Sequence, residues 1–271
     1  MKQIRPFIGG LIACSIALAL VTTAAAQNAQ QGIAKVVYIK GSARYLSGAN
    51  TTWQPLKNGA ILKPGSIVQT ASDSYVDVVL NNPDATGIAM SAMSASSASA
   101  SAAGSGGGSG YHPRAEQDAV RIFENTVLGI DKLTVDQTGA DVVTETQLDL
   151  KAGSIFGTVK KLSAASKYEV KIPNGVAGIR GTIYWMSADG VLRVLTGSVV
   201  YAYFAPDGKL ATVTVEGGYE FNPRSGQSPQ LMSNSWLDQM KAITKLYAAN
   251  MNGPIPFTAP DCTIHYVSNN R

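Results

Sequence analysis

Short apolar and alternating segments, separated by turn residues, run through most of the chain. In the first third they occupy residues 34–39, 43–46, 53–56, 61–62, 67–70 and 75–80, with Asn-Gly at 58–59 and Pro-Gly at 64–65 among the breaks. The same kind of pattern resumes at residue 119 and continues to Phe221. Short strands rich in Val, Ile and Tyr with such turns are typical of β-rich folds. We therefore expect an all-β domain over residues 32–221, built as a twisted β-solenoid or a sandwich-like sheet.

Four Gly-Ser pairs open apolar or alternating segments along the chain. They lie at residues 41–42, 65–66, 153–154 and 197–198. Glycine adopts positive φ without the steric cost that other residues bear, so each pair predicts a turn before the next strand. Because two pairs precede the middle of the chain and two follow it, the repetition favours one β domain rather than two.

Residues 91–110 interrupt this pattern. Apart from Met93 they are all Ser, Ala or Gly, with no charged and no aromatic side chain. Such a segment buries too little apolar surface to offset the entropy of ordering it. We expect a flexible insertion at 84–118, from which residues 91–110 can be deleted without loss of folding.

A helical pattern follows the strand segments, over residues 230–250. Ser235 is placed to cap the helix, and apolar residues recur every three or four positions at Trp236, Met240, Ile243 and Tyr247. This spacing puts them on one stripe, which either packs on the sheet or serves as a docking helix for a partner. Residues 251–271 contain three prolines and predict an extended tail.

The N-terminus has the three-part order of a secretory signal peptide. Two cationic residues precede an apolar run from Phe7 to Val21, and residues 24–26 are the small residues of a cleavage site. We expect residues 1–26 to be removed and the rest to be periplasmic or extracellular. Two alternatives stay open: a lipid anchor on Cys14, and an uncleaved anchor, although the run is short for a bilayer span. In each case the folded part lies outside the cytoplasm.

The composition is that of a folded chain with little charge. Hydrophobic residues make up 45% and charged residues 15%, which provides enough apolar material for a sizeable core. The formal charge of +4 falls to +2 without Lys2 and Arg5, and the remaining cations are scattered. A nucleic-acid partner would need a basic stripe or interleaved aromatic and basic residues. We therefore expect no nucleic-acid binding, and no stable membrane span after signal cleavage.

Residues that could carry catalysis, a metal or a cofactor are sparse. The two histidines, His112 and His265, have no partners at the spacings that metal sites or nucleophile motifs use. Without Cys14 the chain keeps one thiol, Cys262, which is either a plain tail residue or a point of pairing between chains. We expect no enzyme activity, no cofactor and no metal site.

Three pairs of acidic residues could in principle face one another, as glycoside hydrolysis requires. They are Asp73 with Asp77, Asp131 with Asp136, and Asp141 with Glu145. Sequence spacing alone does not bring any of these pairs together. We expect exposed acids at strand ends instead.

Three stretches of the chain resemble the FecR domain family. The first is residues 41–80, with Trp53 and the turn Pro64-Gly65-Ser66-Ile67, where Ser66 replaces an acid of the family. The second is residues 120–128, which is similar to the family's middle strand and turn. The third and most specific begins with residues 150–155 and leads on to residues 168–182. It ends in Pro173-Asn174-Gly175-Val176-Ala177-Gly178-Ile179-Arg180-Gly181-Thr182 and has Ile172 in place of the usual threonine. The resemblance as a whole extends over residues 32–221, with the Ser/Ala/Gly segment as an insertion.

The resemblance implies the extracytoplasmic half of a regulator. In the regulator subfamily a cytoplasmic anti-sigma segment and a membrane helix precede a periplasmic domain, which receives a signal from an outer-membrane TonB-dependent receptor. Because the N-terminus here is typical of a signal peptide, we expect a stand-alone module without that segment and without direct control of a sigma factor. The implied fold is β-rich and binds another envelope protein or a ligand.

Five residues of the third stretch are either a fold motif or a partner contact: Pro173, Gly175, Arg180, Gly181 and Thr182. Gly175 is expected to tolerate a left-handed conformation in a turn. The guanidinium of Arg180 carries five donors that could tie several backbone carbonyls together. The alternative for Arg180 is contact with an anion or a partner.

The expected function is that of a non-catalytic secreted envelope protein that binds a protein partner or receives a signal. The partner would be an envelope protein such as a TonB-dependent receptor, or a surface polymer, and the contact would be an edge strand or residues 235–248. The alternative function is a carbohydrate or cell-wall binding module that uses Trp53, Trp185 and tyrosine residues as an exposed platform. In the first case both tryptophans are core or half-buried strand residues.

Overall fold

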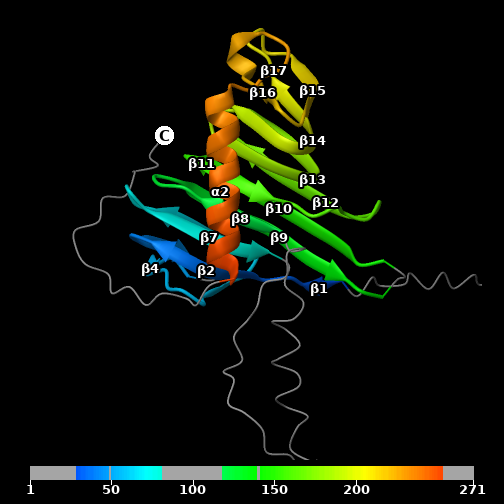
Figure 1. The fold of residues 1–271 in the computed structure, drawn as a ribbon. Coiled ribbons are helices and arrows are strands. Elements are labelled where there is room, and N and C mark those ends of the chain that lie inside the picture. Colours follow the sequence, from blue (N-terminus) through cyan, green and yellow to red (C-terminus); the bar gives the residue numbers. More distant parts are fainter. Residues whose placement is uncertain (1–28, 49, 81–117, 139–140, 253–271) are drawn as a thin grey trace, which may run out of the picture.

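The computed structural model describes residues 29–48, 50–80, 118–138 and 141–252 (Figure 1). The predicted signal peptide with Cys14, most of the predicted insertion with His112, and the tail with Cys262 and His265 lie outside the described residues.

Every strand of the described part belongs to one hydrogen-bonded sheet, which confirms the all-β expectation. The strands before the insertion are β1 (Gln30–Gln31), β2 (Ala34–Lys40), β3 (Ala43–Leu46), β4 (Gln54–Pro55), β5 (Ile61–Leu62), β6 (Ser66–Thr70) and β7 (Tyr75–Leu80). Those after it are β8 (Ala119–Ile122), β9 (Val127–Asp136), β10 (Val143–Ala152), β11 (Ser154–Thr158), β12 (Lys167–Ile172), β13 (Gly175–Ser187), β14 (Leu192–Phe204), β15 (Leu210–Glu216), β16 (Tyr219–Phe221) and β17 (Gln230–Leu231). A short turn of 3-10 helix, η2 (Pro223–Ser225), and the helix α2 (Asn234–Asn252) complete the described elements.

The sheet forks at β13, because the two halves of this long strand have different neighbours. Residues 175–178 pair with β12, whereas residues 183–187 pair with β11. From β12 the pairing continues through β10, β9 and β6 to β3 and β4. From β11 it continues through β8 and β7 to β2 and β5. We call these two branches the β12 arm and the β11 arm.

The two arms pack face to face around a shared core. One buried cluster contains Val78 and Ile122 from the β11 arm together with Leu148 and Val170 from the β12 arm. Along residues 143–150 of β10, buried and partly exposed residues alternate, as expected for a strand with one face on a core. Among the described pairs only β10–β12 is parallel, so the arrangement corresponds to the sandwich-like alternative rather than to stacked parallel coils.

Helix α2 forms a further layer on the outside of the β11 arm (Figure 1). Its last described side chain, Tyr247, packs in a cluster with Val79 and Ala119. Higher on the same face, Met240 packs with Phe156. This cover explains why five of the six residues of β7 are buried on both faces of the strand.

The helix begins later than the sequence pattern predicts. Gln230 and Leu231 belong to β17 and pair with β16, so the helix starts only at Asn234. The capping residue is Ser233 rather than Ser235: the backbone amide of Trp236 donates to Ser233 Oγ at 3.4 Å. An N-cap side chain accepts from an amide two or three positions ahead, and Ser233 has that position.

The four glycines of the Gly-Ser pairs all have positive φ, as the repeated pattern predicts. Their φ values are 74° at Gly41, 87° at Gly65, 77° at Gly153 and 83° at Gly197. Gly153 joins β10 to β11 and Gly197 lies at a bend of β14, so two of these glycines lie close to the fork.

The segments on the two sides of the insertion lie next to each other in the sheet. Strands β7 and β8 pair antiparallel, with Val79 opposite Ala119. The backbone amide of Leu80 donates to the carbonyl of Asp118 at 2.8 Å. The insertion therefore leaves and re-enters the fold at neighbouring positions.

Candidate partner-binding surface

The Pro-Asn-Gly segment of the predicted motif forms the turn between β12 and β13. Ile172 pairs with Gly175, which leaves Pro173 and Asn174 as the two loop residues. The expected left-handed conformation of Gly175 is wrong, since its φ is not positive. Glycine is required there for space, because a Cβ would lie 2.5 Å from the carbonyl oxygen of Ala202 on β14.

The Arg-Gly-Thr segment lies where β13 changes partner. The β13–β14 register shifts between Arg180 and Ile183, and Gly181 has a φ of 65°. Thr182 is buried, and its Oγ1 donates to the carbonyl of Ser198 on β14 at 2.8 Å. A bulge of this kind bends a strand and increases its twist. Gly181 and Thr182 thus shape the fork between the two arms.

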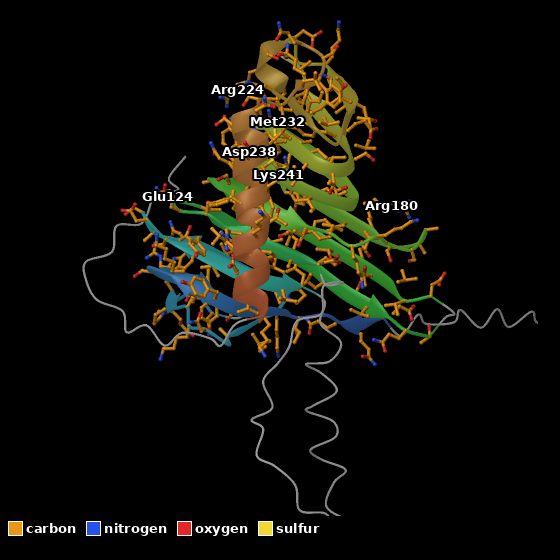
Figure 2. The ribbon with its side chains drawn as sticks, viewed as in Figure 1. Glu124, Arg180, Arg224, Met232, Asp238 and Lys241 are labelled. Carbon is orange, nitrogen blue, oxygen red and sulfur yellow. The ribbon has the colours of Figure 1, made fainter. Side chains whose placement is uncertain are left out.

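Arg180 has a smaller structural role than the sequence suggests. Its side chain is exposed, and its Nη2 donates to one backbone carbonyl, that of Ser163, at 2.7 Å. The prediction that it ties several carbonyls together is therefore wrong, because at the bulge the side chain points away from the core (Figure 2). With Lys161 and Leu162 it lines a shallow hollow that contains no acidic residue.

An ion pair is buried between the sheet and helix α2. Arg121 Nε and Nη2 donate to the two carboxylate oxygens of Asp77 at 2.7 and 2.9 Å. Tyr75 and Tyr247 stand against the guanidinium, with ring centroids 4.2 and 5.6 Å from its carbon. Burial lowers the pKa of Arg121, and the Asp77 carboxylate raises it, so the pKa lies above its usual value. Asp77 therefore faces a cation and not Asp73.

The other acidic pairs do not converge either. Asp131 faces Lys171 at 3.3 Å, and Glu145 faces Lys132 at 2.6 Å. Asp136 accepts a hydrogen bond from the hydroxyl of Thr138, which holds the pKa of Asp136 below its usual value. Across the described residues, His, Cys, Asp and Glu side chains form no group of three that could hold a metal ion.

One acid is buried without a basic side chain bonded to it. Asp118 is 2% exposed, and its Oδ1 accepts from the backbone amide of Lys160 at 2.9 Å. Burial raises the pKa of Asp118 to about 6, although the hydrogen bond and the charge of Lys160 lower it in part. It lies at the start of β8, beside the insertion.

The apolar stripe of α2 is used inside the molecule. Met240 and Tyr247 are buried against the β11 arm, so neither side chain is available to a partner in this structure. Trp236 packs on Trp185 with ring centroids 5.7 Å apart, and Arg193 lies 3.8 Å above the Trp236 ring. Ile243 is partly buried in the same cluster. Of the two expected uses of the stripe, the structure shows packing on the sheet.

The two tryptophans singled out from the sequence do not form a shared platform. Trp185 is half-buried under Trp236 and Arg193. Trp53 precedes β4 and lies under the guanidinium of Arg44, whose carbon is 4.6 Å from the ring centroid. Each ring therefore has a face covered by a cation of the same chain.

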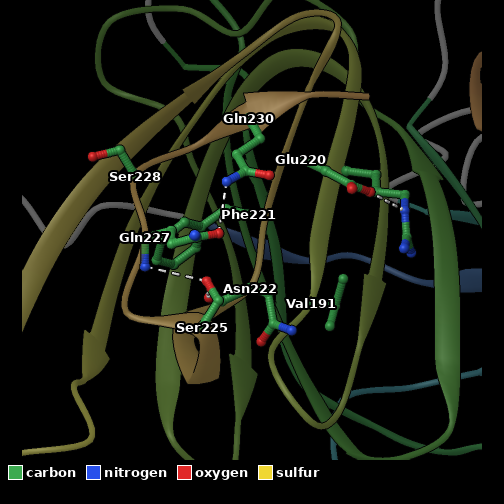
Figure 3. Close-up of a pocket in the computed structure, with 9 residues that line it drawn as sticks. Val191, Glu220, Phe221, Asn222, Ser225, Gln227, Ser228 and Gln230 are labelled. Atoms are coloured by element: carbon green, nitrogen blue, oxygen red, sulfur yellow. Dashed lines mark hydrogen bonds and ion pairs between the residues drawn. The ribbon is translucent and has the colours of Figure 1, made fainter. Parts of the chain in front are cut away.

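A small hollow of about 240 Å³ lies beside β16 (Figure 3). Val191 and Phe221 are its apolar lining residues, and the other side chains around it are polar. Gln230 Nε2 donates to Gln227 Oε1 at 2.6 Å, and Glu220 pairs with Arg193 at 2.8 Å. Because these four side chains bond to one another, they are not available to hold a ligand in the hollow.

One edge of the seven-residue strand β15 has no partner among the described strands. One edge of β15 pairs with β14 from Ser198–Glu216 to Phe204–Leu210, and among the described strands none has residues in register with the other edge; β16 pairs with β14 and β17 instead. The other described strands at the ends of the sheet, β1, β4, β5 and β17, have two residues each, whereas β15 has seven. An unpaired strand edge presents free amides and carbonyls to other chains. In Figure 1 β15 lies at the end of the sheet remote from β2.

The outer face beside this edge is apolar. Val200, Phe204 and Leu210 are 51%, 58% and 70% exposed. Phe204 lies directly opposite Leu210, and Val200 opposite Thr214, so these side chains share one face. We call Val200, Phe204, Leu210 and the free edge of β15 the β15 surface.

The sequence pattern alone does not identify the β15 surface, although an edge strand is among the expected contacts. The signal was present in Leu210-Ala211-Thr212-Val213-Thr214-Val215, an uncharged run that lies between Lys209 and Glu216 and contains no proline. Natural edge strands are usually protected by charges, proline or bulges. Residues 210–215 have neither charges nor proline, so the strand is recognisable as an unprotected edge once its place in the sheet is known.

The middle part of the chain, from β8 into β14, matches a known protein family. Residues 115–200 match the family model described as FecR protein. The predicted FecR resemblance is thereby confirmed for the part of the chain from β8 into β14, which includes the fork. The FecR match supports a signalling or regulatory role.

Two crystal structures from Parabacteroides distasonis, each provisionally named an anti-sigma factor, are similar to part of the chain. The first is 13% identical with a TM-score of 0.35 and covers 48% of this chain and 57% of that one. The second is 14% identical with a TM-score of 0.34 and covers 51% and 67%. A search of curated proteins finds no match. In the part of the chain that the structure describes, no helix has the length and apolar character needed to cross a bilayer.

Proposed function

We propose that the chain is a non-catalytic signalling module of the bacterial envelope that binds a protein partner through the β15 surface. The observation that carries this proposal is the unpaired seven-residue edge of β15. A partner of matching chemistry is an uncharged extended segment that adds a strand to this edge. Strand addition supplies affinity through main-chain hydrogen bonds and specificity through alternate side chains.

The side chains around the edge support a protein strand as its occupant. Thr212 and Thr214 are exposed β-branched residues, and they alternate with Val213 and Val215, which face the core. A strand placed beside them would gain cross-strand contacts on both faces. Phe204 and Leu210 add apolar area next to the edge, where a partner's side chains would lie.

The place of this binding is part of the proposal. The N-terminal signal-peptide pattern, with its apolar run from Phe7 to Val21, supports export to the periplasm or cell surface. The partner that passes the signal to the module is then an envelope protein. A TonB-dependent receptor is one candidate, by resemblance to the FecR domain family. The FecR match supports this regulatory use.

Site-specific photo-crosslinking in cells tests the proposal. A photoreactive amino acid replaces Thr212 at the free edge, and in a matched control it replaces Lys151, which is exposed on β10 in the charged part of the β12 arm. We expect a discrete crosslinked protein band from position 212 and none from position 151. Crosslinks of equal intensity from both positions, or from position 151 alone, would contradict binding at β15.

A further inference from the structure

The free edge of β15 is complementary to itself. The strand is preceded by Lys209, whose exposed Nζ lies 3.3 Å from Asp207, and it ends with Glu216; the residues between Lys209 and Glu216 carry no charge. If two copies of the strand lie antiparallel, the Lys209 end of each meets the Glu216 end of the other. A parallel arrangement would place like charges together at both ends, which is unfavourable.

The side-chain pattern gives the same pairing. On β15 the exposed positions Thr212 and Thr214 share one face, and Val213 and Val215 share the face towards the core. In an antiparallel pair related by a two-fold axis through Val213, Thr212 lies opposite Thr214 of the other copy and Val213 lies opposite Val213, while Val215 lies opposite Ala211. Val213 is half-buried at the rim of the core, so a second strand would extend the core beyond it.

We propose that the β15 edge pairs antiparallel with β15 of a second copy of this chain, which forms a two-fold dimer with one continuous sheet. This rests on the proposed function and names the partner: the strand added at the β15 edge belongs to a second copy of the chain, which then occupies the edge in place of a segment from a receptor. A two-fold contact uses the same edge in both copies, so the dimer is closed and leaves no β15 edge free. Such closure explains how an uncharged edge without proline avoids open-ended association.

Analytical ultracentrifugation of the full chain measures this association. We expect a concentration-dependent monomer–dimer equilibrium in the micromolar range. Thr212→Lys, at an exposed position, places like charges at the centre of the paired strands and should weaken dimerisation at least tenfold. A monomer at every concentration would overturn the proposal.

Charge exchange at the strand ends separates this pairing from other modes of association. Lys209→Glu and Glu216→Lys each create two like-charge contacts per dimer, and each should weaken it by roughly three- to tenfold. The double exchange Lys209→Glu/Glu216→Lys restores both contacts and should return the dissociation constant to within about twofold of the original. A double variant no tighter than the singles would overturn the antiparallel pairing. These exposed positions also keep the proposal testable if Thr212→Lys fails to fold.

The two proposals fail in different ways. A monomeric chain that still crosslinks another protein from position 212 overturns the dimer and leaves the proposed function standing. A dimer that persists unchanged in the Lys variant, with no crosslink from position 212, overturns both.

Discussion

Arg121 and Asp77 form a two-bond ion pair that is sealed between the β11 arm and helix α2. The bonds measure 2.7 and 2.9 Å, and the two side chains are 4% and 0% exposed. Both strands that carry the pair, β7 and β8, border the insertion. The pair therefore joins the segments before and after the insertion beneath the helix.

Removing one partner of this pair should destabilise the fold strongly. Asp77→Ala leaves a buried guanidinium without its carboxylate, and we expect a loss of about 3 to 5 kcal/mol in the free energy of unfolding. Urea denaturation measures the loss. The matched control is Asp131→Ala, which breaks the exposed pair with Lys171 and should cost less than about 1 kcal/mol. Equal losses for the two variants would show that the buried pair is not structural.

The bend of β14 at the fork depends on the absence of a side chain at Gly197. A Cβ there would lie against the carbonyl oxygen of Gly181, and the residue has a φ of 83°. Gly208 has a similar φ of 80° but nothing within 4 Å of an added Cβ. Gly208→Ala should therefore cost about 1 to 2 kcal/mol and Gly197→Ala clearly more, in thermal or urea unfolding. If the two substitutions cost the same, the close contact is unimportant.

Asp118 should make stability fall as the pH rises. The pKa of Asp118 is about 6 in the folded state, above the value near 3.9 of an unfolded chain. Between these values the folded state binds more protons, so the free energy of unfolding decreases from about pH 4 to pH 6 and then levels off for this group. Asp118→Asn keeps an acceptor for the Lys160 amide and should remove this decrease, with a gain on the order of 3 kcal/mol at pH 7. An unchanged pH profile in the variant would contradict this assignment.

Helix α2 should be held by its buried stripe. Met240 is fully buried against Phe156, whereas Leu246 on the same helix is 58% exposed. Met240→Ala should lower the free energy of unfolding by about 2 to 5 kcal/mol, and Leu246→Ala by less than about 0.5 kcal/mol. A small effect at Met240 would mean that the helix leaves the sheet easily.

Deletion of residues 91–110 should leave the fold intact. The flanking strands β7 and β8 pair directly, and the amide of Leu80 bonds to the carbonyl of Asp118, so a much shorter connection can join them. Loop length changes the entropy of closure only slowly. We expect a melting temperature within a few degrees of the full chain, and a large fall would show that the deleted residues contribute contacts.

Local signals made many of the elements predictable. The turn residues around 58–59 and 64–65 separated the early strands, and the Gly-Ser pairs marked turns that all have glycines with positive φ. These features depend on neighbours in sequence, where steric preference acts directly. The apolar stripe of α2 was equally predictable from the sequence. The helix starts later than expected because residues 230–231 pair with β16.

Features that depend on distant neighbours were not predictable in this way. Asp77 and Arg121 are 44 residues apart and meet across the insertion, so no spacing rule links them. Gly175 is required by the approach of β14, which the turn pattern does not contain. The free edge of β15 likewise follows from which strands pair, since a strand's own alternation is the same at the centre and at the edge of a sheet.

Amide hydrogen exchange along β15 tests the central claim most directly. It is measured on the full chain, first alone at high dilution and then with an envelope extract of the source cells. If a strand adds to this edge, exchange should slow selectively for residues 210–215, at least tenfold, while β9 and β10 stay unchanged. Unchanged exchange in β15, together with new protection on another face of the sheet, would contradict the account.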